Sequence, residues 1–347
     1  MKIAIACNKF ALSGGMERYT VDIVREFLRR GIDVSIFTKK ADMNMDLAKQ
    51  VKIHIFKSFL VPHKLKDLAF SYFLKKAFLK EHFDLTLACS RNNACDMVLC
   101  GGTHRGFINA VKNGRTGFYD RIWYKLEQSE FEKAKYVVAH SKFIASEIEK
   151  LYGIDKDKIK VFYPPCAQDR FSAVNKEEIS YLRKSYGLPE NKTLFLFPSS
   201  SHVRKGYPLL SKVFSESNDN VELIVAGRPI DKDLKNVRYI GYVNDIENLY
   251  RCCDYAILAS LYEPFGLVGI ESVLCGHACV LADNIGACEV IKEPALKKFS
   301  AGSESELKAL ITSLSQNKIE LCDPLNQYLT QDFSVKTHVD NLLSLIK

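Results

Sequence analysis

The chain has 347 residues, eleven cysteines and a formal net charge of +8. Its length exceeds what one hydrophobic core usually serves, so we expect two domains. No run of about twenty apolar residues appears, and the N-terminal apolar segment is too short for a signal peptide, so we expect a protein that stays in the cytoplasm. The cysteines are scattered without the paired spacing that zinc needs, which predicts reduced, mostly buried thiols and no metal site.

The positive charge is concentrated in the first half of the chain. Residues 1–165 contain 29 Lys and Arg against 18 Asp and Glu, a net charge of +11, whereas the remaining residues carry −3. Nucleic acid, an anionic lipid surface or an acidic acceptor would suit such a field, and unpaired surface lysines also produce it. Because no nucleic-acid-binding motif accompanies the charge, we expect no nucleic acid partner.

Short apolar segments alternate with helical spacing through the first half of the chain. The strand-like segments are 2–7, 34–37, 51–56, 85–88 and 136–140. Helical spacing at 16–30 lies between the first two, which is the pattern of a βαβ unit and predicts an α/β domain with a parallel, doubly wound sheet. The Tyr163-Pro164-Pro165 run interrupts the pattern and predicts a linker, so we expect an N-terminal Rossmann-like domain over residues 1–165.

A second series of the same kind follows. Its strand-like segments are 194–197, 221–226, 237–240, 255–258 and 278–281. We expect a second Rossmann-like domain over residues 166–324, and a terminal helical segment over 325–347 that is a candidate to cross back onto the first domain. Two facing sheets of this kind would direct the carboxyl ends of their strands into one cleft, where open α/β sheets bind ligands.

Two glutamates flank a glycine where a predicted strand changes into a helix, in the segment Glu263-Pro-Phe-Gly266-Leu-Val-Gly-Ile-Glu271. The free amides and the positive dipole end of such a helix can receive a diphosphate. Eight helical residues would separate the two carboxylates by roughly 12 Å, so they should contact opposite ends of an elongated ligand. A solvated pair of glutamates is the alternative, but apolar neighbours surround Glu271, and a buried carboxylate needs a partner or a ligand.

Adjacent cations follow the first strand of the predicted second domain, in Arg204-Lys205-Gly206. A diphosphate leaving group gains negative charge as its bond to a sugar breaks, and preorganised Arg and Lys side chains stabilise that charge. A solvated Arg-Lys pair is the alternative interpretation. Its place after a strand, in the same domain as the two glutamates, favours the functional one.

A glycine pair follows the first strand and opens the first helix, in Ser13-Gly14-Gly15. Without side chains, these residues let a substrate or a phosphate approach the backbone, although a tight turn without a ligand gives the same pattern. The full G-x-G-x-x-G fingerprint is absent, which disfavours a nicotinamide cofactor, and we expect no cofactor at all.

Together these motifs resemble the retaining glycosyltransferases of family 4, which have the GT-B fold. The matching residues are Gly14-Gly15 with Glu17-Arg18, Lys205-Gly206, Glu263 to Glu271 with Gly276 after it, and the loop from Asn284 through Gly286 to Glu289. The resemblance spans nearly the full length, and its most specific part is the pair of glutamates. It implies an α/β GT-B architecture, with two Rossmann-like domains facing across a cleft, and no metal requirement. The N-terminal domain, residues 1–165, would bind the acceptor, and the C-terminal domain, residues 166–324, would bind the nucleotide sugar.

The resemblance also implies roles for individual residues. Glu263 would contact the donor sugar hydroxyls, and Glu271 the nucleotide ribose. The diphosphate would be held by Arg204 and Lys205. The remaining donor-binding positions would be the backbone of Phe265, Gly266 and Leu267 at the sugar or phosphate, Val243 at the base, and Gly15 at the phosphate from the first domain.

The chain departs from the commoner family pattern at two places. Many members have an Arg five residues before the Lys of the Lys-Gly pair, where this chain has Ser200, and it has Arg204 immediately before that Lys instead. This arrangement resembles the lipopolysaccharide core glucosyltransferases within the family. Ala259 stands where a proline is frequent, a change that should not affect the chemistry.

A histidine follows a glycine pair in the first domain, in Gly101-Gly102-Thr103-His104. His104 matches roughly the position at which related enzymes carry a cleft histidine near the donor sugar and the acceptor. A neutral imidazole could bond a sugar hydroxyl, and its carbonyl could steady the developing positive charge, whereas retaining transfer needs no general base. A structural hydrogen bond is the alternative.

Residues 57–83 interleave lysines with aromatic and aliphatic residues. Such a segment could lie on an anionic membrane surface as a peripheral contact, and a core helix with a lysine-rich solvated face is an equal alternative. The segment from Tyr119 to Glu132, which includes Arg121 and Trp123, could add to that surface or pack internally.

The sequence therefore predicts a metal-independent, retaining hexosyltransferase. Its donor would be a nucleotide diphosphate sugar, with UDP-glucose favoured. Its acceptor would be a saccharide of the lipopolysaccharide core or of another surface glycan, and a lipid-linked saccharide is one candidate. The alternatives are a GT-B epimerase or phosphorylase, and a non-catalytic module that binds nucleotide sugars at a membrane.

Overall fold

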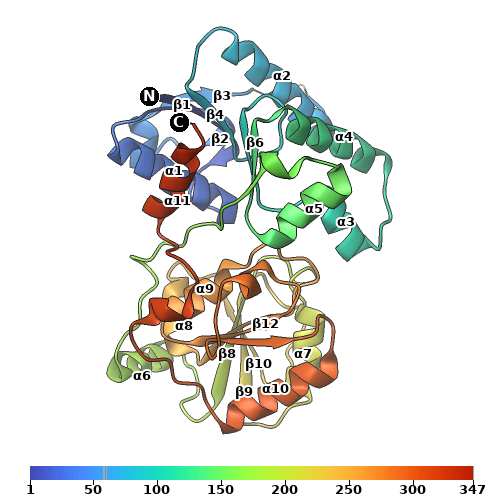
Figure 1. Ribbon diagram of the computed structural model, residues 1–347. Coiled ribbons are helices and arrows are strands. Elements are labelled where there is room, and N and C mark those ends of the chain that lie inside the picture. The colour runs from blue at the N-terminus through green and yellow to red at the C-terminus, as the bar shows by residue number, and fades with distance from the viewer. Residues whose placement is uncertain (58, 60, 347) are drawn as a thin grey trace. The chain divides into compact units, whose positions relative to one another are not determined.

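The computed structural model describes residues 1–57, 59 and 61–346. The described chain divides into two compact units (Figure 1). The first contains Met1–Pro165 together with Phe333–Lys347, and the second contains Cys166–Asp332. Each unit has its own parallel sheet and is described separately below.

The first unit is built on a seven-stranded sheet in the order β3-β2-β1-β4-β5-β6-β7. Its strands are β1 (Lys2–Phe10), β2 (Asp33–Ala41), β3 (Lys52–Ile55), β4 (Leu85–Ala88), β5 (Met97–Cys100), β6 (Tyr136–Ala139) and β7 (Ile159–Val161). Its α-helices are α1 (Gly15–Arg29), α2 (Lys66–Phe78), α3 (His104–Lys112), α4 (Phe118–Lys133), α5 (Lys142–Tyr152) and α11 (Val335–Ser344). The central strands are buried on both faces, which explains why residues 3–7 are apolar without alternation.

The second unit is built on a six-stranded sheet in the order β10-β9-β8-β11-β12-β13. Its strands are β8 (Thr193–Ser199), β9 (Val221–Gly227), β10 (Val237–Gly241), β11 (Tyr255–Leu258), β12 (Ala278–Ala282) and β13 (Leu296–Phe299). Its α-helices are α6 (Lys176–Ser185), α7 (Tyr207–Ser215), α8 (Ile246–Cys252), α9 (Leu267–Leu274) and α10 (Glu304–Gln316). The ladders that join neighbouring strands in this sheet are parallel.

The sequence analysis missed three strands. They are β5, β7 and β13, each three or four residues long. A run as short as Met97–Cys100 has no periodicity of its own, and β7 and β13 each carry lysine within the strand. Their neighbours in the sheet, which the sequence does not reveal, make them strands. The ten predicted strands are all present.

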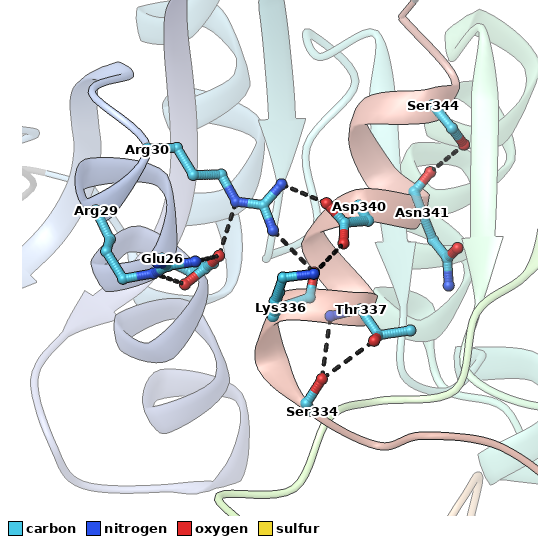
Figure 2. A network of polar contacts seen from close by, with 9 residues as sticks. All are labelled: Glu26, Arg29, Arg30, Ser334, Lys336, Thr337, Asp340, Asn341 and Ser344. Atoms are coloured by element: carbon cyan, nitrogen blue, oxygen red, sulfur yellow. Dashed lines mark hydrogen bonds and ion pairs between the residues drawn. The ribbon is translucent and has the colours of Figure 1, made fainter.

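The terminal helix α11 packs on α1 in the first unit (Figure 1). Figure 2 shows the polar part of this contact, in which the Arg30 guanidinium lies 2.6 Å from Asp340 and donates to the carbonyl of Lys336 at 3.0 Å. Val339 and Leu342 join the same buried core as β1 and α1. The last helix therefore belongs to the unit that begins the chain.

The predicted boundary before the terminal segment needs correction. We expected this segment to begin at residue 325, but residues 325–332 stay with the second unit. Backbone hydrogen bonds join Lys292 to Tyr328 at 2.8 Å and Thr330 to Val290 at 3.0 Å, and Leu329 forms a bridge with Ile291. Because of these pairings, the second unit ends at Asp332, eight residues beyond the predicted boundary at residue 324.

Eleven free cysteines lie in the described part of the chain, and nine of them are buried. This agrees with the expectation of reduced, mostly buried thiols. Within the described ranges, we find no helix with the length and apolar character required to span a bilayer.

Candidate active site

The second unit places its charged loops at the point where the strand order reverses. β8 lies in the middle of the sheet, with β9 on one side and β11 on the other. The chain leaves β8 toward α7 and leaves β11 toward α9, and open parallel sheets bind ligands at the strand ends where the order reverses in this way. The loop after β8 carries Arg204 and Lys205, and the loop after β11 carries Glu263.

A glycine lets these two loops approach each other. Gly206 caps α7 in the left-handed region, at φ 83°. A Cβ atom at this position would lie 1.9 Å from the carbonyl oxygen of Ala259, which follows β11. A hydrogen bond of 2.8 Å from the Leu261 amide to the Arg204 carbonyl fixes the approach. The glycine of the Lys-Gly pair is therefore required for steric reasons.

Arg204 and Glu263 form an ion pair across these loops. Arg204 Nη1 lies 3.0 Å from Glu263 Oε2 and also donates to the Tyr262 carbonyl at 2.9 Å. About a quarter of the arginine side chain and 14% of the glutamate side chain stay exposed. Among the residues that the structure describes, only the Nη1 atom of Arg204 takes part in these bonds, so its remaining N–H groups can serve a ligand.

Lys205 is held beside the same pair. Its ammonium group donates to the carbonyl of Pro198, in β8, at 2.9 Å. Burial lowers the pKa of Lys205, and the charges of Glu263 and Glu271 oppose that shift. The contact with Pro198 fixes the ammonium group at the carboxyl end of β8, in the loop that also carries Arg204.

The segment that follows β12 holds the loop from Glu263 to Gly266 in place. Glu263 forms a parallel bridge with Ile285, and the Ala287 amide donates to the Phe265 carbonyl at 2.7 Å. Gly266 then caps α9 with φ 88°, so α9 begins at Leu267. The first amides of a helix lack partners within it, and this turn therefore presents donors and a positive dipole end beside Glu263.

Glu271 lies on α9 and has a specific partner. Tyr250 Oη, from α8, donates to Glu271 Oε2 at 2.5 Å. Burial raises the pKa of Glu271, while the tyrosine hydrogen bond and the charge of Lys205 act in the opposite direction. The tyrosine thus holds one carboxylate oxygen and leaves the other for a ligand. Val243, the predicted neighbour of the base, follows β10 and is half-buried.

The two predicted site residues of the first unit lie at the carboxyl ends of its strands. Gly15 is the first residue of α1, which follows β1. A Cβ atom at Gly15 would meet no described atom within 4 Å, so packing does not require a glycine there. The open space at this position is compatible with a ligand that approaches the backbone.

His104 begins α3 and is oriented by an acid. Its Nε2 lies 2.8 Å from Asp120 Oδ1, and its ring meets Trp123 edge to face with centroids 5.2 Å apart. The hydrogen bond from the Gly117 amide, followed by the one with His104, lowers the pKa of Asp120. Since a carboxylate only accepts, Nε2 donates and Nδ1 of the neutral ring remains an acceptor.

The structure therefore brings seven of the predicted residues together in the second unit, on the loops after β8 and β11 and on α9. They are Arg204, Lys205, Glu263, Phe265, Gly266, Leu267 and Glu271. The sequence analysis missed Tyr250 and Asp120, which orient Glu271 and His104. Each lies on a different helix from its partner, at no spacing that marks a motif.

Comparisons with known proteins agree with this geometry. Residues 13–170 match the sequence family Glycosyltransferase Family 4, and residues 178–332 match Glycosyl transferases group 1. A protein of Burkholderia thailandensis described as a probable transglycosylase is 36% identical over 351 residues, covering 99% of this chain and 96% of that protein. An uncharacterised glycosyltransferase of Methanocaldococcus jannaschii is 23% identical over 84% of this chain and 83% of its own.

Solved structures share the fold over the full length. WaaG, a glycosyltransferase involved in lipopolysaccharide biosynthesis, has a TM-score of 0.80 at 15% identity, and the match covers 99% of both chains. HepE of Anabaena, solved with UDP and glucose, has a TM-score of 0.77 at 18% identity and covers 100% of this chain and 99% of its own.

The two parallel α/β units have the GT-B fold of these solved structures. The chain belongs to glycosyltransferase family 4. The predicted resemblance and fold class are thereby confirmed.

Proposed function

We propose that this glycosyltransferase moves a hexose from a nucleotide diphosphate sugar to a saccharide hydroxyl with retention of the anomeric configuration. One observation carries the proposal: Arg204, Lys205 and the start of α9 gather positive charge and amide donors beside Glu263. A diphosphate needs that charge when it leaves, and a sugar needs an acceptor such as Glu263 for its hydroxyls.

The transfer requires one bond to break and one to form. The bond from the sugar C1 to the diphosphate oxygen breaks, and a new bond joins C1 to the acceptor oxygen on the same face. The acceptor proton passes to an oxygen of the leaving diphosphate, so no protein base is needed. In this scheme Arg204 and Lys205 stabilise the leaving charge, Glu263 orients the sugar, and Glu271 accepts from the ribose hydroxyls.

UDP-glucose is the favoured donor, and a lipopolysaccharide core or another surface glycan is the favoured acceptor. Support comes from relatives in fold: HepE was solved with UDP-glucose, and WaaG acts in lipopolysaccharide biosynthesis. An O-antigen chain mannosyltransferase of Escherichia coli is 25% identical over 51% of this chain. Stabilisation by a panel of UDP-, ADP- and GDP-sugars would rank the donors, because a bound ligand raises the unfolding temperature with its occupancy.

The decisive variants are Glu263→Ala and Lys205→Ala. Both should abolish transfer while circular dichroism and the unfolding temperature report an intact fold. Unaltered turnover in either variant would overturn the proposal. We also propose that transfer needs no metal ion, because protein cations serve the diphosphate; addition of EDTA should leave the rate unchanged.

The proposed transfer has three alternatives. The probable transglycosylase of Burkholderia thailandensis suggests transfer from a glycoside rather than from a nucleotide sugar. A GT-B epimerase or phosphorylase, or a non-catalytic module that binds nucleotide sugars, would use the same donor-binding residues. Product analysis with and without acceptor separates these activities, since only the proposed transferase releases a nucleoside diphosphate in step with a new glycoside.

We further propose that the first unit contacts an anionic membrane from the cytoplasmic side. More than half of the large hydrophobic side chains that the structure describes as exposed lie in two segments of this unit: Ile55, Phe59, Leu65, Leu68, Tyr72, Leu79, Phe118 and Tyr119. Lys64 Nζ lies 4.0 Å from the Tyr119 ring centroid and joins the segments. Cations flank both segments, whereas Asp67 pairs with Lys39 and Asp120 is buried.

This combination suits a surface that offers both negative headgroups and an apolar boundary. Co-sedimentation with phosphatidylglycerol vesicles tests it. Binding should weaken with added salt, with pure phosphatidylcholine, and in a Phe118→Ser/Tyr119→Ser variant. Tyr181→Ser, which alters an exposed tyrosine of the second unit, is the control. Equal binding by both variants would contradict the membrane contact.

A further inference from the structure

A histidine lies in the loop that carries Arg204 and Lys205. This loop, residues 200–206, joins β8 to α7, and we call it the cation loop. His202 is half-buried there, two residues before Arg204. The proposed transfer gives this side chain no role, yet its contacts connect the cation loop to the ends of β8 and β9 and to α7.

The two ring nitrogens of His202 bind groups at two strand ends. Nε2 lies 2.9 Å from the carbonyl oxygen of Arg228 and 3.0 Å from that of Pro229, both of which follow β9. Because carbonyl oxygens only accept, Nε2 carries a proton and donates to both. Nδ1 lies 3.0 Å from Ser199 Oγ, so in the neutral ring it accepts from that hydroxyl.

The segment that accepts from His202 is itself fixed on the sheet. The Arg228 amide donates to the Ser199 carbonyl at 2.8 Å, and Tyr239 Oη, from β10, donates to the Gly227 carbonyl at 2.9 Å. A Cβ atom at Gly227 would lie 2.5 Å from the Ser199 carbonyl oxygen, so the ends of β8 and β9 are in close contact. His202 therefore attaches the cation loop to a part of the unit that is held by three strands.

The histidine ring also packs against two aromatic rings. Its centroid lies 4.8 Å from that of Tyr207, the first residue of α7, and 6.4 Å from that of Phe197, which is fully buried in β8. The Tyr207 amide donates to the His202 carbonyl at 2.9 Å. These contacts fix the orientation of the ring, so its Nε2 hydrogen bonds are preorganised.

The cation loop is short and is held from both sides. Backbone hydrogen bonds of 3.0 Å and 3.2 Å close it into a turn over residues 201–206. The Leu261 amide, after β11, donates to the Arg204 carbonyl and holds one side, and His202 holds the other side on the end of β9. Because only a few residues separate these attachments, loss of the histidine contacts should move Arg204 and Lys205.

We infer that His202 is a positioning residue for the diphosphate. It acts through Arg204 and Lys205, which it holds in place by its hydrogen bonds to the carbonyls after β9. The inference rests on the proposed role of these two cations at the leaving group. It predicts that loss of the Nε2 hydrogen bonds weakens binding of the terminal phosphate and lowers turnover, while binding of the base, the ribose and the first phosphate is retained.

The test compares the affinities of UMP and UDP for the full chain by isothermal titration. The two ligands differ only in the terminal phosphate, so the ratio of their affinities reports the contacts of that group. His202→Asn, whose shorter amide cannot reach the carbonyls after β9, should weaken UDP binding about tenfold relative to UMP, the effect of one lost hydrogen bond to a charged group. Turnover of UDP-glucose should fall about tenfold to a hundredfold, because a displacement of about 1 Å is enough for such a loss.

Two further variants complete the series. His202→Gln carries an amide N–H that can reach the position of Nε2, so it should keep most of the wild-type ratio of UDP to UMP affinity. His277→Leu is the matched control, since His277 Nε2 also donates to a backbone carbonyl of the second unit, that of Arg251, at 2.9 Å. This control should lower the unfolding temperature without changing the ratio.

The outcomes separate this inference from the proposed function. An unchanged affinity ratio in His202→Asn would overturn the inference, and so would equal weakening of UMP and UDP or an equal change of the ratio in His277→Leu. If His202→Asn does not fold, His202→Leu and His202→Gln provide the same comparison. Absence of UDP binding by the wild type would instead overturn the proposed donor site, and the inference with it.

Discussion

The guanidinium of Arg204 lies 3.0 Å from the carboxylate of Glu263, although 59 positions separate the two residues in the sequence. The pair joins the loops that follow β8 and β11, at the reversal of strand order. It places a cation for the leaving diphosphate next to an acid for the sugar. We expect Glu263→Gln, which keeps the shape of the side chain, to lower turnover about 10²- to 10³-fold.

The same variant should change the free energy of unfolding by no more than about 1 kcal/mol, because the ion pair is partly exposed. Chemical denaturation and steady-state kinetics on one preparation measure both effects. A large loss of stability with retained turnover would assign the pair a structural role instead.

Gly206 should tolerate no side chain. Its left-handed backbone and the 1.9 Å approach of a Cβ atom to the Ala259 carbonyl predict that Gly206→Ala costs about 2–4 kcal/mol of unfolding free energy. Gly187 is the matched control, because it has φ 62° but open space around a Cβ atom. Gly187→Ala should cost about 1 kcal/mol. Urea denaturation measures the unfolding free energy of both variants. Equal losses in Gly206→Ala and Gly187→Ala would show that the loops after β8 and β11 can move apart at little cost.

Gly15 should behave in the opposite way. Because Gly15→Ala adds a methyl group to open space at the start of α1, it should leave stability unchanged or raise it by up to about 1 kcal/mol. If a phosphate approaches this backbone, the methyl group should weaken nucleotide-sugar binding at least tenfold. Isothermal titration with UDP-glucose measures the affinity, and an unchanged affinity would remove Gly15 from the donor site.

Donor binding should depend on pH through Glu271. Only its ionised form accepts from both ribose hydroxyls, and burial raises its pKa above the ordinary 4.5. Affinity for UDP-glucose should therefore increase as the pH rises through the raised pKa. The hydrogen bond from Tyr250 favours the ionised form. Tyr250→Phe should consequently move the pH profile of UDP-glucose affinity to higher pH. An unshifted profile would show that Tyr250 does not control the ionisation of Glu271.

The contribution of Glu271 to the unfolding free energy should change with pH in the opposite direction to donor affinity. A carboxyl whose folded pKa is raised stabilises the fold fully below its unfolded pKa and loses that contribution as the pH rises through the folded pKa. Compared with Glu271→Gln, the wild type should thus lose unfolding free energy from about pH 4.5 upward. Parallel denaturation series of the two proteins measure this difference.

Local pattern was sufficient to predict much of the second unit's site. Gly266 lies between a buried strand and a helix in the sequence, and it caps that helix in the structure. The pairing of Arg204 with Glu263 needs the strand order, which spacing along the chain does not reveal. The roles of Tyr250 and Asp120 could not be predicted for a related reason. Tyr250 contacts Glu271, and Asp120 contacts His104, from a different helix in each case.

Three strands and the boundary near the end of the second unit also depend on contacts that the sequence does not reveal. Apolar runs predicted ten strands, including the edge strands β3 and β10, but three strands that depend on their neighbours were missed. The 325–332 segment carries no apolar pattern that ties it to the second unit, and backbone pairing with residues 290–292 decides its place.

The central claim is that the loops bearing Arg204, Lys205 and Glu263 transfer a hexose from a nucleotide diphosphate sugar. Its most direct test is the release of UDP from UDP-glucose by the wild type and by Glu263→Gln. The acceptors in this assay are the methyl α-glycosides of glucose, galactose and mannose. We predict release by the wild type together with an α-linked glucoside product, and at least a hundredfold lower release by the variant. Equal release by both proteins, or a product of inverted configuration, would contradict it.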